Sequence, residues 1–199
     1  MGPFFAHSNA LRAPNGRIFM KLDTRVRDLG PVNHAALKAA VRAIHPDAWL
    51  EDTLRQDAYA NVHSQTQSII LLFCEGWPKV EISPRKGWEY FAPQAVPIIQ
   101  AICDAHYKAD GVVIRAMVAK LVAGGFIAPH EDAHPSFSVA HRVHVPLITN
   151  DKVDFTIGGE VFNLKEGLAY EVSNLDTHSV HNRSSEDRVH FIFDYAESD

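Results

Sequence analysis

From residue 112 to near the end of the chain, short apolar runs alternate with turn residues, and this rhythm limits the folds that the chain can adopt. Three glycine-containing pairs, Gly124-Gly125, Gly158-Gly159 and Glu166-Gly167, supply the positive φ angles that hairpin turns need. Successive hairpins favour a β-sandwich or jelly roll over alternating strands and helices. The expected strands are Val112–Leu121, Phe126–Asp132, Ala140–Ile148, Val153–Ile157, Glu160–Leu164, Leu168–Val172, His178–His181 and Arg188–Tyr195.

Residues 1–111 predict a mixed helical and strand cap that supports this β region. Asn33 is a suitable N-cap for a short helix that ends before Pro46, and residues 67–73 form an apolar strand. The segment Gly76–Pro93 has neither a helical nor a strand period, so we expect a long loop there, followed by a second helix over residues 93–107. No linker is visible, and a chain of 199 residues predicts a single domain, with residues 112–195 as its core.

Composition argues against several classes of partner. A formal charge of −5 gives no basic footprint for nucleic acid, although a flipped base as substrate stays open. The N-terminus has no basic region followed by an apolar run, and no stretch of about 18 apolar residues predicts a membrane span, so a cytoplasmic location is expected. Cys74 and Cys103 are the only cysteines and have no Cys-x-x-Cys spacing, which indicates reduced core residues. The oligomeric state is left open.

Three side chains of the β region form a pattern that is typical of a metal site. Residues two apart on a strand share a face, so His130 and Asp132 can both reach one ion, while the turn before His178 places it at the start of another strand. Two imidazoles and one carboxylate leave three positions of an octahedral metal open, as in non-haem Fe(II) oxygenases. Singly, a solvated loop pair and a buried structural histidine explain these residues equally well; jointly they favour a metal.

The same alternation gathers polar side chains on one face of two otherwise apolar strands. Arg142 and His144 share a face in one strand, and Arg188 and His190 share a face in the other. A buried guanidinium needs an anionic partner, and a dicarboxylate such as 2-oxoglutarate, bound bidentately, provides one. The alternative is an ion pair on the exterior of the barrel between Arg142 or Arg188 and one of the acids Glu171, Asp187 and Asp194.

Together these motifs resemble the aspartyl/asparaginyl β-hydroxylase branch of the 2-oxoglutarate/Fe(II)-dependent dioxygenases, which includes small bacterial amino-acid hydroxylases. The resemblance rests on the run from Leu121 to Asp132, on Arg142-Val-His144-Val-Pro-Leu, on Gly167, and on His178-Ser-Val-His-Asn182 followed by residues 188–194. It covers residues 112–195 well and the N-terminal part loosely. Some members lack the carboxylate ligand, but Asp132 indicates the full triad here.

The resemblance implies a mainly β fold, a double-stranded β-helix (jelly roll, cupin-like) with flanking N-terminal helices. It implies Fe(II) held by His130, Asp132 and His178, and 2-oxoglutarate chelating that metal with its distal carboxylate on Arg188 and with Arg142 and His144 nearby. The implied reaction uses dioxygen to hydroxylate a C–H bond of an amino acid, an amino-acid derivative or a peptide side chain, and it converts 2-oxoglutarate to succinate and carbon dioxide.

Two other classes of protein fit parts of the pattern. A cupin-like metal or small-ligand binding protein without oxygenase turnover accounts for the barrel and the histidines, but it leaves Arg188 without a task. A β-sandwich interaction module accounts for the strands alone. Fold does not separate these classes, whereas succinate formation does.

The substrate is expected to contact loops around the mouth of the barrel. Arg85 and Lys86 in the segment 76–93, together with Arg115, are the cations available for a substrate carboxylate, and His134 follows the metal motif. Asn182 flanks the distal histidine, where turn hydrogen bonds are an equally good explanation. A small anionic or zwitterionic molecule fits so short a chain best.

Overall fold

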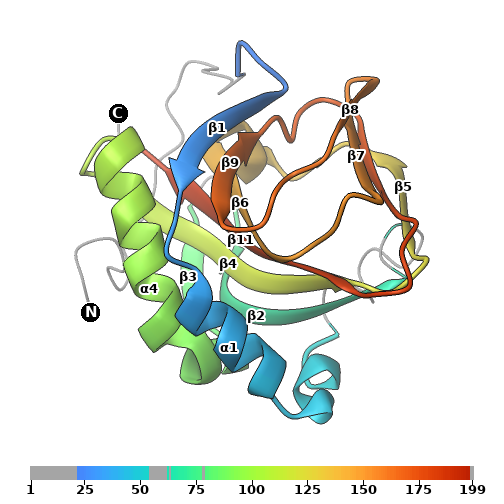
Figure 1. Cartoon of the computed structure of the whole chain (residues 1–199). Helices are drawn as coiled ribbons and strands as arrows, with labels where there is room; N and C mark the ends of the chain where they lie inside the picture. Colours follow the sequence, from blue (N-terminus) through green and yellow to red (C-terminus); the bar gives the residue numbers. More distant parts are fainter. Residues whose placement is uncertain (1–21, 54–61, 63, 78, 198–199) are drawn as a thin grey trace.

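Two antiparallel sheets form the centre of the computed structural model, which describes residues 22–53, 62, 64–77 and 79–197 (Figure 1). The larger sheet has seven strands in the order β1-β9-β6-β11-β4-β2-β3: β1 (Val26–Pro31), β2 (Thr66–Glu75), β3 (Glu81–Pro84), β4 (Val112–Leu121), β6 (Ala140–Ile148), β9 (Leu168–Val172) and β11 (Arg188–Ala196). The smaller sheet has the order β5-β10-β7-β8: β5 (Phe126–His130), β7 (Val153–Ile157), β8 (Glu160–Phe162) and β10 (His178–Asn182). The helices with described bounds are α1 (Ala35–Ala43) and α4 (Lys86–His106), with the 3-10 turns η1 (Pro46–Leu50) and η2 (Pro135–Val139).

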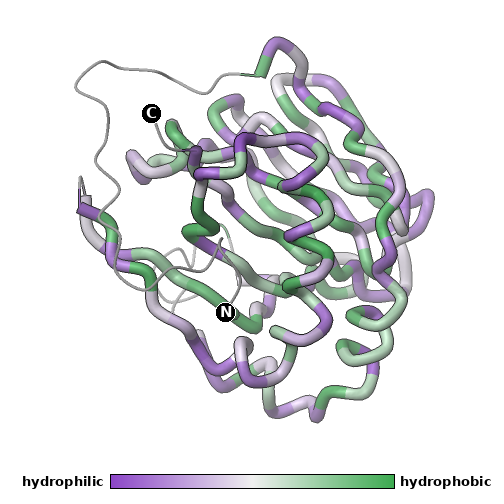
Figure 2. Tube along the Cα trace, turned by 90° about the vertical axis from the view of Figure 1, so that its left-hand side faces the viewer, coloured by the Kyte–Doolittle hydropathy of each residue, from purple (hydrophilic) through white to green (hydrophobic). Residues whose placement is uncertain are grey.

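Each face of the larger sheet is covered by a different layer. Leu37 of α1 and Phe91 of α4 pack against Phe191 of β11 on one face. The smaller sheet lies over the other face, where Phe155 of β7 packs with Leu121 of β4. Hydrophobic positions recur along the strands in Figure 2, with hydrophilic residues between them. The fold is therefore mainly β, with an apolar core under the helices and a second space between the sheets.

The expected strands of the β region are all present. Four have the predicted bounds: β4, β6, β7 and β9. The other four differ by one or two residues at one end, since β5 ends at His130, β8 at Phe162, β10 at Asn182 and β11 at Ala196. Strand β2 extends beyond the predicted residues 67–73 at both ends, and β1 was not predicted.

The prediction of a long loop over Gly76–Pro93 was wrong. Strand β3 lies within it, and α4 begins at Lys86, so Pro93 and Pro97 are inside the helix. These two prolines are four residues apart and exposed, which leaves the carbonyl groups that lose a helical bond on the hydrated side. Buried residues on the opposite side of α4 pack on the sheet and hold the helix together through the prolines.

The N-terminal helix differs slightly from its prediction. It spans Ala35–Ala43 and ends before Pro46, but its N-cap is His34 and not Asn33. None of the described helices is both long and apolar enough to cross a membrane. Residues 1–15, where the sequence has no basic region followed by an apolar run, lie outside the described part of the chain.

The predicted alternation of β6 and β11 is confirmed. Val145 and Phe191 face the helices. On the reverse face, His144 lies against Phe155 of the smaller sheet, with ring centroids 5.5 Å apart. The polar residues of both strands thus point into the space between the two sheets.

Candidate metal centre

His130, Asp132 and His178 come together at one end of the space between the sheets. His130 ends β5 and His178 begins β10, and the two residues are direct partners in the antiparallel ladder. Their rings lie 4.3 Å apart between centroids. One ligand atom from each of the three residues lies within 4.8 Å of the others. Two imidazole nitrogens and one carboxylate oxygen are a donor set that suits Fe(II), so the residues present fit the metal.

The backbone fixes which nitrogen of each imidazole is available. His130 Nδ1 lies 2.8 Å from the carbonyl of Ala128, and His178 Nδ1 lies 3.0 Å from the carbonyl of Asp176. A carbonyl only accepts, so each Nδ1 carries the proton and each Nε2 presents a lone pair. Burial lowers the pKa of His178, against the opposing effect of Asp132. Its ring is therefore neutral at pH 7, as a metal ligand must be.

A guanidinium joins the ligand carboxylate to a second, deeper carboxylate. Arg142 donates to Asp132 Oδ2, and through Nε and Nη2 it donates to the two oxygens of Asp194 at 2.8 and 3.0 Å. Asp194 is 1% exposed and lies opposite Arg142 in the β6–β11 ladder. The alternative of an Arg142–Asp194 ion pair is thus correct about the partner and wrong about the face, because the pair lies between the sheets.

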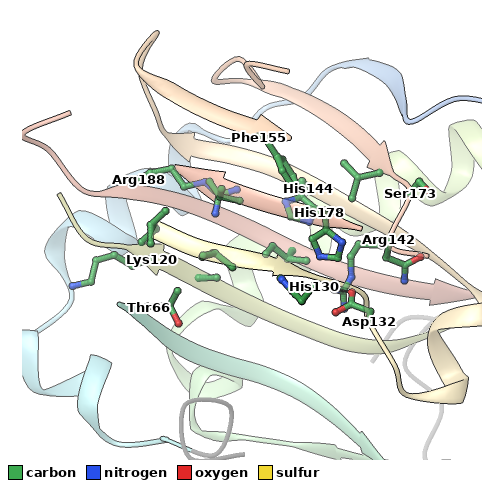
Figure 3. Close-up of a pocket in the computed structure, with 17 residues that line it drawn as sticks. Thr66, Lys120, His130, Asp132, Arg142, His144, Phe155, Ser173, His178 and Arg188 are labelled. Carbon is green, nitrogen blue, oxygen red and sulfur yellow. Dashed lines mark hydrogen bonds and ion pairs between the residues drawn. The ribbon is translucent and has the colours of Figure 1, made fainter. Parts of the chain in front are cut away.

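A narrow cavity runs from the three residues toward Arg188, which is 3% exposed (Figure 3). Its lining includes His144. Arg188 donates from Nη2 to His190 Nδ1 at 2.6 Å. Burial, followed by the charges of Arg188 and His144, lowers the pKa of His190 well below its usual value. The neutral ring accepts a hydrogen bond and adds no charge that repels Arg188, so the guanidinium is held in place as a cation.

A second, wider cavity of about 470 Å³ opens on the other side of the same residues. It shares His130, Asp132, Arg142 and Ile192 with the narrow cavity, so the candidate metal centre lies where the two meet. Its further lining is partly apolar and aromatic, with a few polar groups: Val62, Phe73, Cys74, Glu75, Gly76, Arg115, Met117, Glu131, Ala133, His134 and Phe137.

Arg115 and His134 are connected on the wall of this wider cavity. Arg115, 5% exposed, donates from Nη1 to the Ser136 hydroxyl at 2.8 Å, and it stacks 4.4 Å from the centroid of Phe137. His134 Nδ1 accepts the Ser136 amide at 3.3 Å and lies 2.8 Å from the Ser136 hydroxyl. Burial and, secondarily, Arg115 lower the pKa of His134. The neutral ring therefore carries its proton on Nε2.

Three residues that the sequence suggested for substrate binding are not brought to this site. Arg85 pairs with Asp52 at 3.1 Å and Lys86 with Glu89 at 2.8 Å, beside a separate surface hollow. Asn182 is fully buried and lines neither cavity. Its amide donates to the carbonyls of residues 122 and 186, which makes it a turn residue.

Comparison with known proteins agrees with this geometry. The family model described as aspartyl/asparaginyl beta-hydroxylase matches residues 39–198. The chain belongs to this family. It is a non-haem, 2-oxoglutarate- and Fe(II)-dependent dioxygenase of the hydroxylase type. A search of curated proteins gave no match.

Solved structures resemble this β-hydroxylase family member in fold. One is an oxidoreductase of the 2OG-Fe(II) oxygenase family from Burkholderia pseudomallei, at 16% identity and a TM-score of 0.50 over 83% of this chain and 90% of that one. Another is the non-heme alpha-ketoglutarate-dependent epimerase SnoN from nogalamycin biosynthesis, at 13% identity and a TM-score of 0.55 over 87% and 76%. At these identities the likeness concerns the fold alone.

Proposed function

We propose that this dioxygenase hydroxylates a C–H bond of an amino acid, an amino-acid derivative or a peptide side chain. In this proposal His130, Asp132 and His178 hold Fe(II), and the two sheets with their flanking helices form a double-stranded β-helix in a single domain. The observation that carries the proposal is the position of the three donors, at the meeting point of a narrow and a wide cavity. One cavity then serves the co-substrate and the other the substrate.

The residues that line the narrow cavity suit the chemistry of 2-oxoglutarate. Its inner end holds the buried Arg188, whose planar fork matches a distal carboxylate, and His144 lines it nearer the metal centre. Arg142 borders both cavities. When bound, the metal and 2-oxoglutarate supply an oxidant made from dioxygen, with succinate, carbon dioxide and the hydroxylated product as the outcome. The protein residues orient the co-substrate and keep water from the reacting atoms.

The wide cavity suits a small substrate. Its volume of about 470 Å³ is within the range of about 300–1,000 Å³ that is common for small-ligand sites, and its wall combines apolar residues with few polar groups. His134 and Arg115 are the substrate candidates that line it. This volume would hold only the reacting side chain of a peptide, whereas it would hold a small free molecule entirely. A small free molecule is therefore favoured.

The test is succinate formation from 2-oxoglutarate with Fe(II) and ascorbate, first alone and then with a panel of amino acids. The variant His178→Ala should lose both succinate formation and Ni(II) binding measured by calorimetry. The matched control is His181→Ala, because His181 lies on the same strand and lines neither cavity. Metal-dependent succinate formation that survives in His178→Ala would refute the ligand assignment. A wild-type protein that binds Ni(II) but forms no succinate would support the binding-protein alternative.

A further inference from the structure

Apart from the exposed Glu75 and Glu131 at the rim of the wide cavity, the charged residues between the sheets leave one positive charge in excess. Arg115, Arg142 and Arg188 bring three positive charges, and Asp132 and Asp194 bring two negative ones. Fe(II) adds two positive charges and 2-oxoglutarate adds two negative ones, so one positive charge remains in the loaded enzyme. Buried charge without a partner is strongly unfavourable. This count rests on the proposed function, which supplies the metal and the co-substrate.

The remaining positive charge is located at Arg115. Arg142 takes both oxygens of Asp194 at 2.8 and 3.0 Å, whereas Arg115 Nη1 reaches the same carboxylate only at 3.6 Å. Two guanidiniums therefore share one carboxylate, and Arg115 has the weaker share. Arg188 is at the far end of the narrow cavity and does not line the wide one. Arg142 also lines the wide cavity, but it already binds the carboxylates of Asp132 and Asp194. Arg115 is thus the cation that an anionic group in the wide cavity would meet.

The surroundings of Arg115 are preorganised for such a group. Its guanidinium is held by Ser136 and lies against the rings of Phe73 and Phe137, 5.9 and 4.4 Å from their centroids. His134 Nδ1 accepts the hydrogen bond of the Ser136 amide, so the N–H of the ring is on Nε2. A rigid guanidinium and a neutral N–H donor suit the two oxygens of a carboxylate.

The rim of the wide cavity has the opposite charge. Glu75 and Glu131 line the cavity and are exposed, so their carboxylates lie toward solvent. A second anionic group on the substrate would be repelled there, and an ammonium group would be attracted.

In the narrow cavity, Lys120 Nζ lies 3.9 Å from Asp187 Oδ2, so this pair adds no unbalanced charge.

We propose that the substrate is a small monocarboxylate, bound with its carboxylate on Arg115 and His134 and with any ammonium group toward Glu75 and Glu131.

The experiment compares each of the common amino acids with its carboxamide and with its decarboxylated amine. Binding is read as the thermal shift of the Ni(II)- and 2-oxoglutarate-loaded protein, and turnover as succinate formed with Fe(II). Acids that bind should exceed their amides by about 10- to 100-fold in affinity, the value of a charge-assisted hydrogen bond. Amides or amines that bind as well as the acids, or no acid that binds better than its amide, would overturn the inference.

Variants locate the carboxylate site. Arg115→Met should weaken binding of the best acid by about 10- to 100-fold and remove the preference over the amide, and Arg115→Lys should restore part of it. The control Arg85→Met removes a cation of the separate surface hollow and should behave as wild type. An unchanged preference in folded Arg115→Met contradicts the proposal; if that variant does not fold, the acid–amide comparison on the wild type still decides. Failure of succinate formation with intact acid binding would instead count against the proposed function.

Discussion

Asp194 is the residue whose replacement should reveal most about how the site is held. Asp194 is 1% exposed, and its carboxylate accepts two hydrogen bonds from Arg142, at 2.8 and 3.0 Å. Arg115 Nη1 lies 3.6 Å from Oδ2 of the same carboxylate. In Asp194→Asn the charge is lost, and the amide nitrogen faces a guanidinium that can only donate. Breaking a buried ion pair costs about 3–5 kcal/mol. Since Arg142 keeps Asp132 as a partner, we expect the lower end, about 3 kcal/mol.

That loss should appear as a lower melting temperature of the metal-free protein. For a chain of this length, about 2–4 °C per kcal/mol gives a decrease of about 6–12 °C. The metal site should weaken as well, because Arg142 is then left with Asp132 as its only described carboxylate partner and competes with the metal for it. Residues that orient a ligand typically change metal affinity by about 10- to 100-fold. Isothermal titration with Ni(II) measures this directly, without turnover.

The matched control is Glu171→Gln, which neutralises a buried carboxylate on the helix side of the same sheet. Glu171 is 2% exposed and is held by Arg27 at 2.7 Å, His141 at 2.6 Å and Tyr107 at 3.0 Å. This variant should lose comparable stability but keep its Ni(II) affinity. If both variants bind Ni(II) like wild type, or if both lose affinity equally, Asp194 has no specific role in orienting Asp132.

Three further predictions concern the co-substrate, the pH dependence and the packing of α4. Arg188→Lys should raise the KM for 2-oxoglutarate by at least about 10-fold while Ni(II) binding survives, because a point charge does not replace the planar fork; an unchanged KM would refute this role. Since the pKa of His190 lies well below 6.5 in the fold, the unfolded chain binds more protons there at low pH. The free energy of unfolding should therefore decrease as the pH is lowered from about 6.5, by at most about 1.4 kcal/mol per pH unit from this residue. Urea titrations at several pH values should show that the unfolding free energy of His190→Gln depends less steeply on pH. Gly87→Ala should cost about 1–3 kcal/mol in the same titrations, because the added Cβ would lie 2.5 Å from the Ile70 carbonyl oxygen.

The β region was predictable because its signal is local. A strand buried on one face alternates every second residue, and glycines at positive φ mark its turns, so β4, β6, β7 and β9 have the bounds expected from sequence. Strand β1 gives no such signal. It lies at the edge of the larger sheet, has Leu29 as its buried residue, and contains Gly30 at a register shift. Only its pairing with β9 makes it a strand.

The start of α4 was missed for the opposite reason. Pro93 and Pro97 indicate a helix start when read locally, yet both fit inside the helix because their face is exposed. The same helix carries Lys86 in its first turn and follows directly on Arg85, so both cations lie beside α4 and away from the site. Of the three expected substrate cations, only Arg115 lines the wide cavity. The position of the other two depends on how α4 packs against the sheet, which the local sequence does not show.

The spacing of the three metal-ligand candidates in the sequence predicts that they lie together. The alternation of side chains along the strands also predicts the face on which the partner of Arg142 lies, but the sequence analysis places that partner on the exterior. Arg188 and His190 were correctly placed on the inner face of β11, and residues 192 and 194 share that face by the same alternation. Asp194 was considered an exterior acid, although parity puts it opposite Arg142 on the inside, where the ladder pairs the two.

Strand β11 is buried on both faces, so each of its polar side chains needs a hydrogen-bonding or charged partner. Its helix-side residues, such as Phe193, stabilise the core by burying apolar surface, which needs no particular partner. The inward polar residues instead depend on specific partners, as Arg188 does on His190 and Asp194 does on Arg142 and Arg115. Hydrophobic residues of similar volume would serve stability equally well or better at such positions. The arrangement is therefore better explained by the ligands it receives than by the fold it supports, and the guanidinium with the weakest share of a carboxylate, Arg115, is the one that borders the open cavity.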